Sequence, residues 1–202
     1  VWEEGNGHPI LLGDREVILE LKAEIGFDAD VPIYDPKTPE EDKRRFHYAD
    51  IFWKERRRKG ISLLDAQKWM RERNYFAAMM VHEGEADALV TGYSRSYPSV
   101  VKPMLQLIGK APGISIVAST NMMMTNRGPI FFSDTAINPN PTADDIAKIA
   151  IMTANTVKLF GLEPVMAMVS FSNFGSSNHD SAVKLREAVA YLHKYYPDLI
   201  VD

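Results

Sequence analysis

The sequence predicts an α/β fold divided into two lobes, and three observations support this. Short apolar segments alternate with helical patterns of about ten residues or more, which is typical of a largely parallel sheet covered by helices. The pattern changes at Pro112-Gly113, a pair that strongly favours a break between elements. The 202 residues are 46% hydrophobic and 25% charged, enough for a full core. We therefore expect one α/β lobe over residues 1–111 and another over 112–202.

Apolar runs bounded by turn residues predict the strands. They lie at residues 9–13, 86–92, 114–124, 129–137 and 165–169, with a further extended segment at 31–36. The turn Asn126-Arg127-Gly128 predicts a hairpin between the two central runs. Residues 86–92 and 165–169 are expected to form buried strands, because most of their side chains are apolar.

Helical spacing and capping residues predict the helices. They are expected at residues 14–25, 38–59, 62–73, 75–81, 98–108, 143–160 and 182–192. Asp14 is a natural N-cap, and three pairs have the spacing of a capping box: Thr38 with Glu41, Ser62 with Asp65, and Thr142 with Asp145. The chain opens like the end of a helix followed by a strand and closes on a strand just begun, so we expect it to be part of something longer.

Composition excludes several classes of function. The net charge of −4 argues against a nucleic-acid-binding domain. There are no cysteines for disulfides or thiolate metal sites, and no apolar run long enough to span a membrane. No targeting signal opens the chain, and we expect a cytoplasmic protein. The histidines lack the spacing of metal ligands, so no metal is expected; they are His8, His47, His82, His179 and His193.

Two loops combine hydroxyl groups with a glycine between an expected strand and an expected helix. They are SFSNFGSSNH at residues 170–179 and GYSRSYP at 92–98. Ligands bind outside the carboxyl ends of strands in α/β sheets, and the free N–H groups of a helix N-terminus attract anions. Each loop is therefore either a phosphate cradle or an ordinary turn with a helix cap. Arg95 in the second loop is either part of an anion site or a solvated surface residue.

Two further features carry charge. The basic run KERRRKG at residues 54–60 ends an expected helix, where cations complement the helix dipole; an arginine of this run as a phosphate clamp is the alternative. Asp134 lies within an apolar run, FSDTA, where a lone buried carboxylate is costly. It must be paired or face a polar cleft, and we favour the cleft.

Motifs along nearly the whole chain resemble those of the phosphotransacetylase family. GEADALVTG at residues 84–92 and KPMLQ at 102–106 resemble its GxADxxVxG and RPxLQ patterns. FSDTAINPNP at 132–141 resembles FADxAxNxxP, SFSNFGS at 170–176 resembles SxSxxGS, and RRRKG at 56–60 resembles RxxKG.

The resemblance implies a two-lobed three-layer sandwich, like isocitrate and isopropylmalate dehydrogenases, incomplete at both ends. It implies transfer of an acetyl group between coenzyme A and phosphate without a metal, in a cleft between the lobes. The residues it assigns to acyl-CoA or phosphate binding are Arg56, Ser94, Tyr97, Lys102, Asp134, Ser172, Asn173, Ser176 and Ser177. Catalytic residues stay unassigned, because the family's catalytic segment lies outside this sequence.

Two departures indicate a subgroup. Lys102 stands where the family has Arg, and Phe174 where the usual loop has Lys. Together with YSRSY at 93–97 they resemble the phosphotransacetylase-like C-terminal domain of NADP-dependent malic enzymes. That resemblance implies regulation of an upstream malic enzyme domain by acetyl-CoA, and a homo-oligomer, dimer or higher. NADP and a divalent metal are expected only in that upstream domain. The alternatives are an active phosphate acetyltransferase and an oligomerisation scaffold without a ligand.

Overall fold

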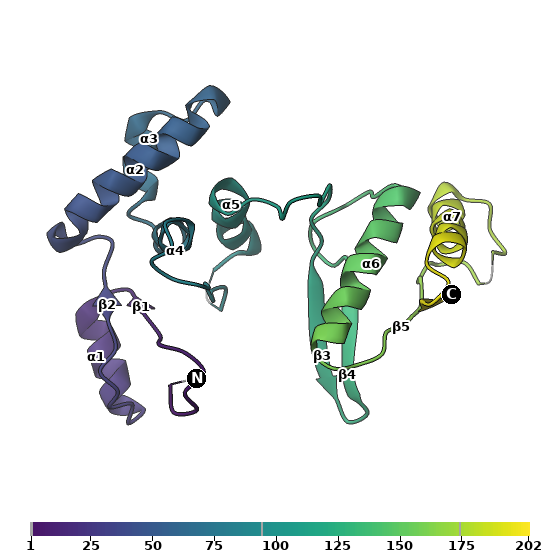
Figure 1. Ribbon diagram of the computed structural model, residues 1–202, viewed down its shortest axis with the longest axis horizontal. Helices are drawn as coiled ribbons and strands as arrows, with labels where there is room; N and C mark the ends of the chain where they lie inside the picture. Colours follow the sequence, from purple (N-terminus) through teal and green to yellow (C-terminus); the bar gives the residue numbers. More distant parts are fainter. Residues whose placement is uncertain (1, 94, 174) are drawn as a thin grey trace. The chain divides into compact units, whose positions relative to one another are not determined.

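The computed structural model describes residues 2–93, 95–173 and 175–202, and the chain divides into two units (Figure 1). These are Val1–Gly109 and Lys110–Asp202. The division lies two residues before the boundary that we predicted between residues 111 and 112.

The first unit opens with a two-residue parallel strand pair and a helix. Strand β1 (Leu11–Leu12) pairs with β2 (Ile33–Tyr34), and helix α1 (Arg15–Glu24) connects them. The carboxylate of Asp14 accepts the N–H groups of Glu16 and Val17 at 3.0 and 3.3 Å, which confirms the predicted N-cap.

Helices make up the rest of this unit. They are η1 (Pro39–Glu41), α2 (Asp42–Arg56), η2 (Arg57–Lys59), α3 (Leu63–Trp69), α4 (Arg73–His82) and α5 (Tyr97–Leu107), of which η1 and η2 are 3₁₀ turns. The capping box of Ser62 and Asp65 is confirmed. The one predicted at Thr38 is wrong, because its hydroxyl donates to the carbonyl of Asp35 at 3.2 Å and the chain enters α2 through a 3₁₀ turn.

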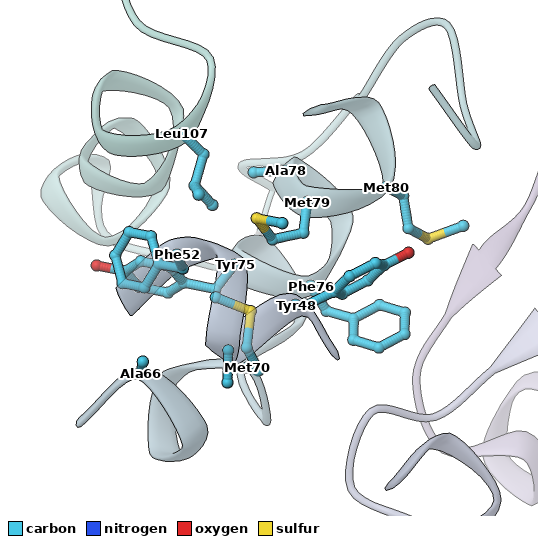
Figure 2. Packing of buried hydrophobic residues seen from close by; sticks show 11 residues of the cluster. Tyr48, Phe52, Ala66, Met70, Tyr75, Phe76, Ala78, Met79, Met80 and Leu107 are labelled. Carbon is cyan, nitrogen blue, oxygen red and sulfur yellow. The ribbon is translucent and has the colours of Figure 1, made fainter. Parts of the chain in front are cut away.

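The core of the first unit is formed between helices (Figure 2). Tyr48 and Phe52 from α2 meet Tyr75 and Phe76 from α4, with ring centroids 5.2 Å apart for Tyr48–Phe76 and 5.7 Å for Phe52–Tyr75. Burying each such side chain contributes about 1.5–3 kcal/mol. The cluster is completed by Ala49, Ala66, Met70, Ala78, Met79, Met80 and Leu107.

The second unit joins a hairpin to two helices. Strand β3 (Thr120–Thr125) pairs antiparallel with β4 (Gly128–Ser133), as the turn residues predicted, and α6 (Ala143–Leu159) runs along the hairpin (Figure 1). Strand β5 (Val165–Met166) pairs in parallel with β6 (Ile200–Val201), beside helix α7 (Asp180–Tyr195). Thr142 and Asp145 form the predicted capping box of α6. The core consists of Ile146, Ala147, Ala150, Ala188, Leu192 and Val201.

The predicted strands are the part of the fold that required correction. Residues 86–92 form no strand, and Val90 is 96% exposed; of residues 165–169 only the first two pair, and Val169 is 84% exposed. In place of one largely parallel sheet, the described residues contain three separate two-stranded sheets. An apolar run becomes a buried strand only when neighbouring strands satisfy its backbone groups, and these segments lack such neighbours within the described residues.

Candidate functional site

A groove of about 1540 Å³ lies within the first unit. Its wall is built from residues 6–12, from the C-terminal end of α3 and the N-terminal end of α4, from residues 85–93, and from the first turns of α5. Its cationic lining residues are Lys68, Arg73, Arg95 and Lys102, and its acidic ones are Glu72, Glu85 and Asp87. Hydroxyl groups of Thr91, Tyr93, Ser96 and Ser99 also line it. A groove with this lining suits a large ligand that carries anionic groups.

Asn74 connects two walls of the groove. Its side-chain amide donates to the carbonyl of Ser99 in α5 at 3.2 Å, and its side-chain carbonyl accepts the hydroxyl of Thr91 at 2.8 Å. This bridge ties residues 85–93, which form no strand, to the start of α5. Sequence reasoning missed Asn74, because it lies in the first turn of a helix with no motif around it.

Lys102 is the predicted site residue that the structure places in this groove. Its ammonium nitrogen lies 5.0 Å from the centroid of the Trp69 ring, a cation–π contact. Trp69 stacks on Tyr75 with centroids 5.3 Å apart and an interplanar angle of 21°. The hydroxyl of Tyr75 donates to the side-chain oxygen of Gln106 at 2.7 Å, and burial raises the pKa of Tyr75.

Glu85, which lines the groove, is held by Tyr48 of the core and by Arg44. The buried hydroxyl of Tyr48 donates to Glu85 Oε1 at 2.6 Å, and Arg44 Nε lies 3.5 Å from Glu85 Oε2. Burial, together with the hydrogen bond to Glu85, raises the pKa of Tyr48, so the phenol stays protonated and acts as a fixed donor. This carboxylate therefore keeps its orientation.

The other predicted residues of the first unit lie elsewhere. Arg56 is not among the groove residues; its guanidinium donates to the carbonyls of Leu105 and Gln106 in the last turns of α5. Tyr97 begins α5 and is 44% exposed, while its neighbours Ser96 and Pro98 line the groove. Ser94 lies outside the described residues.

In the second unit, Asp134 is paired with hydrogen-bond donors. Its Oδ1 accepts the backbone N–H and the hydroxyl of Ser119 at 3.0 and 2.9 Å. Its Oδ2 accepts the backbone N–H and side-chain amide of Asn138 at 2.8 and 2.6 Å. Partial burial raises the pKa of Asp134, but these hydrogen bonds outweigh it and leave the pKa below its ordinary value. The carboxylate thus organises the chain that follows the hairpin.

The loop at residues 170–179 brings together the remaining predicted residues. The Ser172 hydroxyl accepts the N–H of Ser177 at 3.1 Å and lies 3.3 Å from the Ser176 hydroxyl. The carbonyl of Asn173 accepts the N–H of Ser176 at 2.9 Å. Phe174, the residue that differs from the family's usual Lys, lies outside the described residues.

Arg186 supports this loop from α7, and sequence reasoning missed it. Its guanidinium donates to the carbonyl of Gly175 at 2.9 Å, and a Cβ on Gly175 would lie 2.9 Å from Arg186 Nη1. Gly175 also has a φ of +75°, which favours glycine. Arg186 lies about two helical turns into α7, and no motif around it marked this contact with the loop.

Among the described residues, no group of three or more His, Asp or Glu side chains is placed to hold a metal ion. No helix formed by these residues is both long and apolar enough to cross a membrane.

Comparison with known proteins gives one family over the full length. The family model described as "Phosphate acetyl/butaryl transferase" matches residues 1–202. A phosphate acetyltransferase from Clostridium acetobutylicum is 36% identical over 100% of this chain and 62% of its own length. An NAD-dependent malic enzyme from Rhizobium meliloti is 34% identical over 99% of this chain and 26% of its own.

Known structures agree with this. A phosphotransacetylase from Streptococcus pyogenes matches with a TM-score of 0.79 and 37% identity, over 99% of this chain and 60% of its own. The chain thus spans about three fifths of that protein and of the Clostridium enzyme. The α/β fold described above corresponds to part of a phosphotransacetylase structure. The chain belongs to the phosphate acetyl/butaryl transferase family.

Proposed function

We propose that this chain is the phosphotransacetylase-like domain of an NADP-dependent malic enzyme and binds acetyl-CoA as a regulatory module. The observation that carries the proposal is the groove of the first unit, with Lys68, Arg73, Arg95 and Lys102 in its lining. Coenzyme A carries several phosphates, and cations around a large groove suit such a ligand. Within a chain of net charge −4, the groove lining has four cationic residues against three acidic ones, Glu72, Glu85 and Asp87.

Two basic residues favour regulation over catalysis. Arg56, which the resemblance assigns to phosphate, is bonded to the end of α5 and is not among the groove residues. Lys102 also replaces a family Arg, and an ammonium does not reproduce the two-pronged hydrogen bonding of a guanidinium. Relatives named malic enzymes match this chain over 26% of their length, so a similar domain occurs within those larger proteins. Two relatives named phosphate acetyltransferases match over 27% and 28% of theirs, so this share does not separate the two functions.

The test uses the full-length protein that carries this chain. We expect acetyl-CoA to bind by calorimetry, to change the rate of NADP-dependent malate decarboxylation, and to support no acetyl phosphate formation. Coenzyme A without the acetyl group is the matched ligand, which separates recognition of the phosphates from recognition of the thioester. Absence of acetyl-CoA binding would refute the proposal.

The second candidate is an active phosphate acetyltransferase, which forms acetyl phosphate and CoA from acetyl-CoA and phosphate. It is favoured by the relatives named phosphate acetyltransferases, which are 36% and 37% identical over 100% of this chain. Acetyl transfer that depends on both CoA and phosphate, at ordinary enzymatic rates, would support it over the regulatory proposal.

A further inference from the structure

The pair formed by Trp69 and Lys102 stands out in the groove, because an aromatic ring faces a flexible cation there. The two side chains come from different helices, α3 and α5, and both line the groove. The ammonium nitrogen of Lys102 lies 5.0 Å from the ring centroid, within the range of a cation–π attraction. The electron-rich face of the indole therefore limits where this charge can lie.

The ring of Trp69 is itself held by the core. It stacks on Tyr75 at 5.3 Å and lies 5.9 Å from the ring of Phe52, which is completely buried. Tyr75 is 8% exposed, and its hydroxyl is bonded to Gln106 of α5. This stack gives Trp69 little freedom to turn, so its contact with Lys102 is anchored to rigid structure.

A lysine in a phosphate site has a specific weakness, which the indole can offset. The ammonium lies at the end of a flexible side chain. It lacks the planar geometry with which an arginine guanidinium binds a phosphate through two hydrogen bonds. Ordering such a side chain when a ligand binds costs conformational entropy. Holding the ammonium at the groove wall beforehand reduces this cost, which is how preorganisation raises affinity.

We infer that Trp69 is a positioning residue, which holds the Lys102 ammonium in the groove for a phosphate group of the CoA ligand. This inference rests on the proposed function and adds to it the means by which a lysine serves at this position. Trp69 acts through Lys102 and has no ligand contact of its own in this role.

The experiment measures acetyl-CoA affinity by calorimetry on the full-length protein and on a double-mutant cycle. We expect Trp69→Leu to weaken binding about two- to fivefold, the factor that corresponds to an exposed cation–π contact. Lys102→Met should weaken it at least as much, and Trp69→Leu added to Lys102→Met should cause no further loss. Trp69→Phe should bind nearly as the natural protein does, because it keeps an aromatic face.

Salt dependence separates positioning from a general structural effect. Lys102→Met removes a charge at the phosphate, so it should lower the slope of affinity against salt concentration; Trp69→Leu should leave that slope unchanged. Trp53 and Arg57 form a matched pair, with the Arg57 guanidinium 5.6 Å from the Trp53 ring and neither residue lining the groove. Trp53→Leu should therefore leave the affinity unchanged.

The results distinguish the inference from the function on which it rests. If the natural protein binds no acetyl-CoA, the proposed function fails and the inference fails with it. If it binds, but the effects of Trp69→Leu and Lys102→Met multiply, the positioning role is wrong and the proposed function stands. Unchanged affinity in Trp69→Leu would overturn the inference in the same way.

Discussion

The carboxylate of Asp134 accepts hydrogen bonds from both the backbone and side chains of Ser119 and Asn138. Each oxygen accepts two donors, so replacing one oxygen by an amide group would set donor against donor. These bonds tie the segment before β3 to the segment after β4. The charge of Asp134 thus has a structural use, whichever ligand the protein binds.

We predict that Asp134→Asn lowers the free energy of unfolding at neutral pH by about 1–3 kcal/mol, because two donors lose their acceptor. The pKa of Asp134 is lowered in the folded chain, so its stabilisation is present above its unfolded pKa of about 4 and is lost as pH falls below that. The difference between the two proteins, measured by urea unfolding, should therefore shrink below about pH 4.

Asp144 provides the control for that measurement. It is exposed and pairs with Lys148 at 2.6 Å on the surface of α6. Water screens such exposed pairs, so Asp144→Asn should have little effect on the free energy of unfolding. Equal effects of the two substitutions would contradict the role of Asp134.

Arg56 also acts on structure, at the end of α5. We predict that Arg56→Ala lowers the free energy of unfolding by about 1 kcal/mol, because the last carbonyls of the helix lose a charged donor. Arg58, an exposed residue of the following 3₁₀ turn, is the control, and Arg58→Ala should be close to neutral. Weaker acetyl-CoA binding by Arg56→Ala at unchanged stability would instead assign Arg56 to the ligand.

At the scale of elements, α6 joins the hairpin to the core of the second unit. Its capping box places the Thr142 hydroxyl 3.2 Å from the N–H of Asp145, while Asp145 bonds back to Thr142. We predict that Thr142→Ala costs about 1 kcal/mol in the free energy of unfolding, measured by chemical denaturation. Thr142→Ser keeps the hydroxyl and should be nearly neutral; equal losses from both would show that the cap is not responsible.

Helices were predictable from sequence because their signals are local. Asp14, Ser62 and Thr142 cap helices as predicted, and each acts within three residues of its own position. Strands depend on partners far away in the chain. Residues 86–92 have the composition of a buried strand, yet no described strand pairs with them. Composition alone cannot supply that information.

The residues of the candidate site, like the elements of the fold, were predictable from sequence only in part. Lys102, which a contiguous motif assigned to the site, lines the groove of the first unit, and its role in ligand binding stays a prediction. Trp69, Asn74 and Arg186 were missed, because each acts on a residue from another element. Their importance comes from spatial neighbours, which a reading of one sequence without the fold does not contain.

At the scale of the whole molecule, each unit has a core of its own. Phe52 is completely buried in the first and Leu192 in the second. The groove and its cations belong entirely to the first unit, whereas the serine loop at 170–179 belongs to the second. The two candidate anion sites can therefore be distinguished by where a ligand protects the backbone.

We predict that acetyl-CoA slows amide hydrogen exchange in residues 85–93 and in the first turns of α5, because these segments line the groove and are held to each other by Asn74. Mass spectrometry of the full-length protein would measure this, with and without ligand. Pantetheine, which lacks the phosphates of coenzyme A, is the matched ligand and should protect much less at Arg95 and Lys102. The protection by acetyl-CoA should also weaken as salt is added, because the groove cations are near the surface. Protection confined to residues 170–179 would place the ligand on the serine loop and contradict binding in the groove.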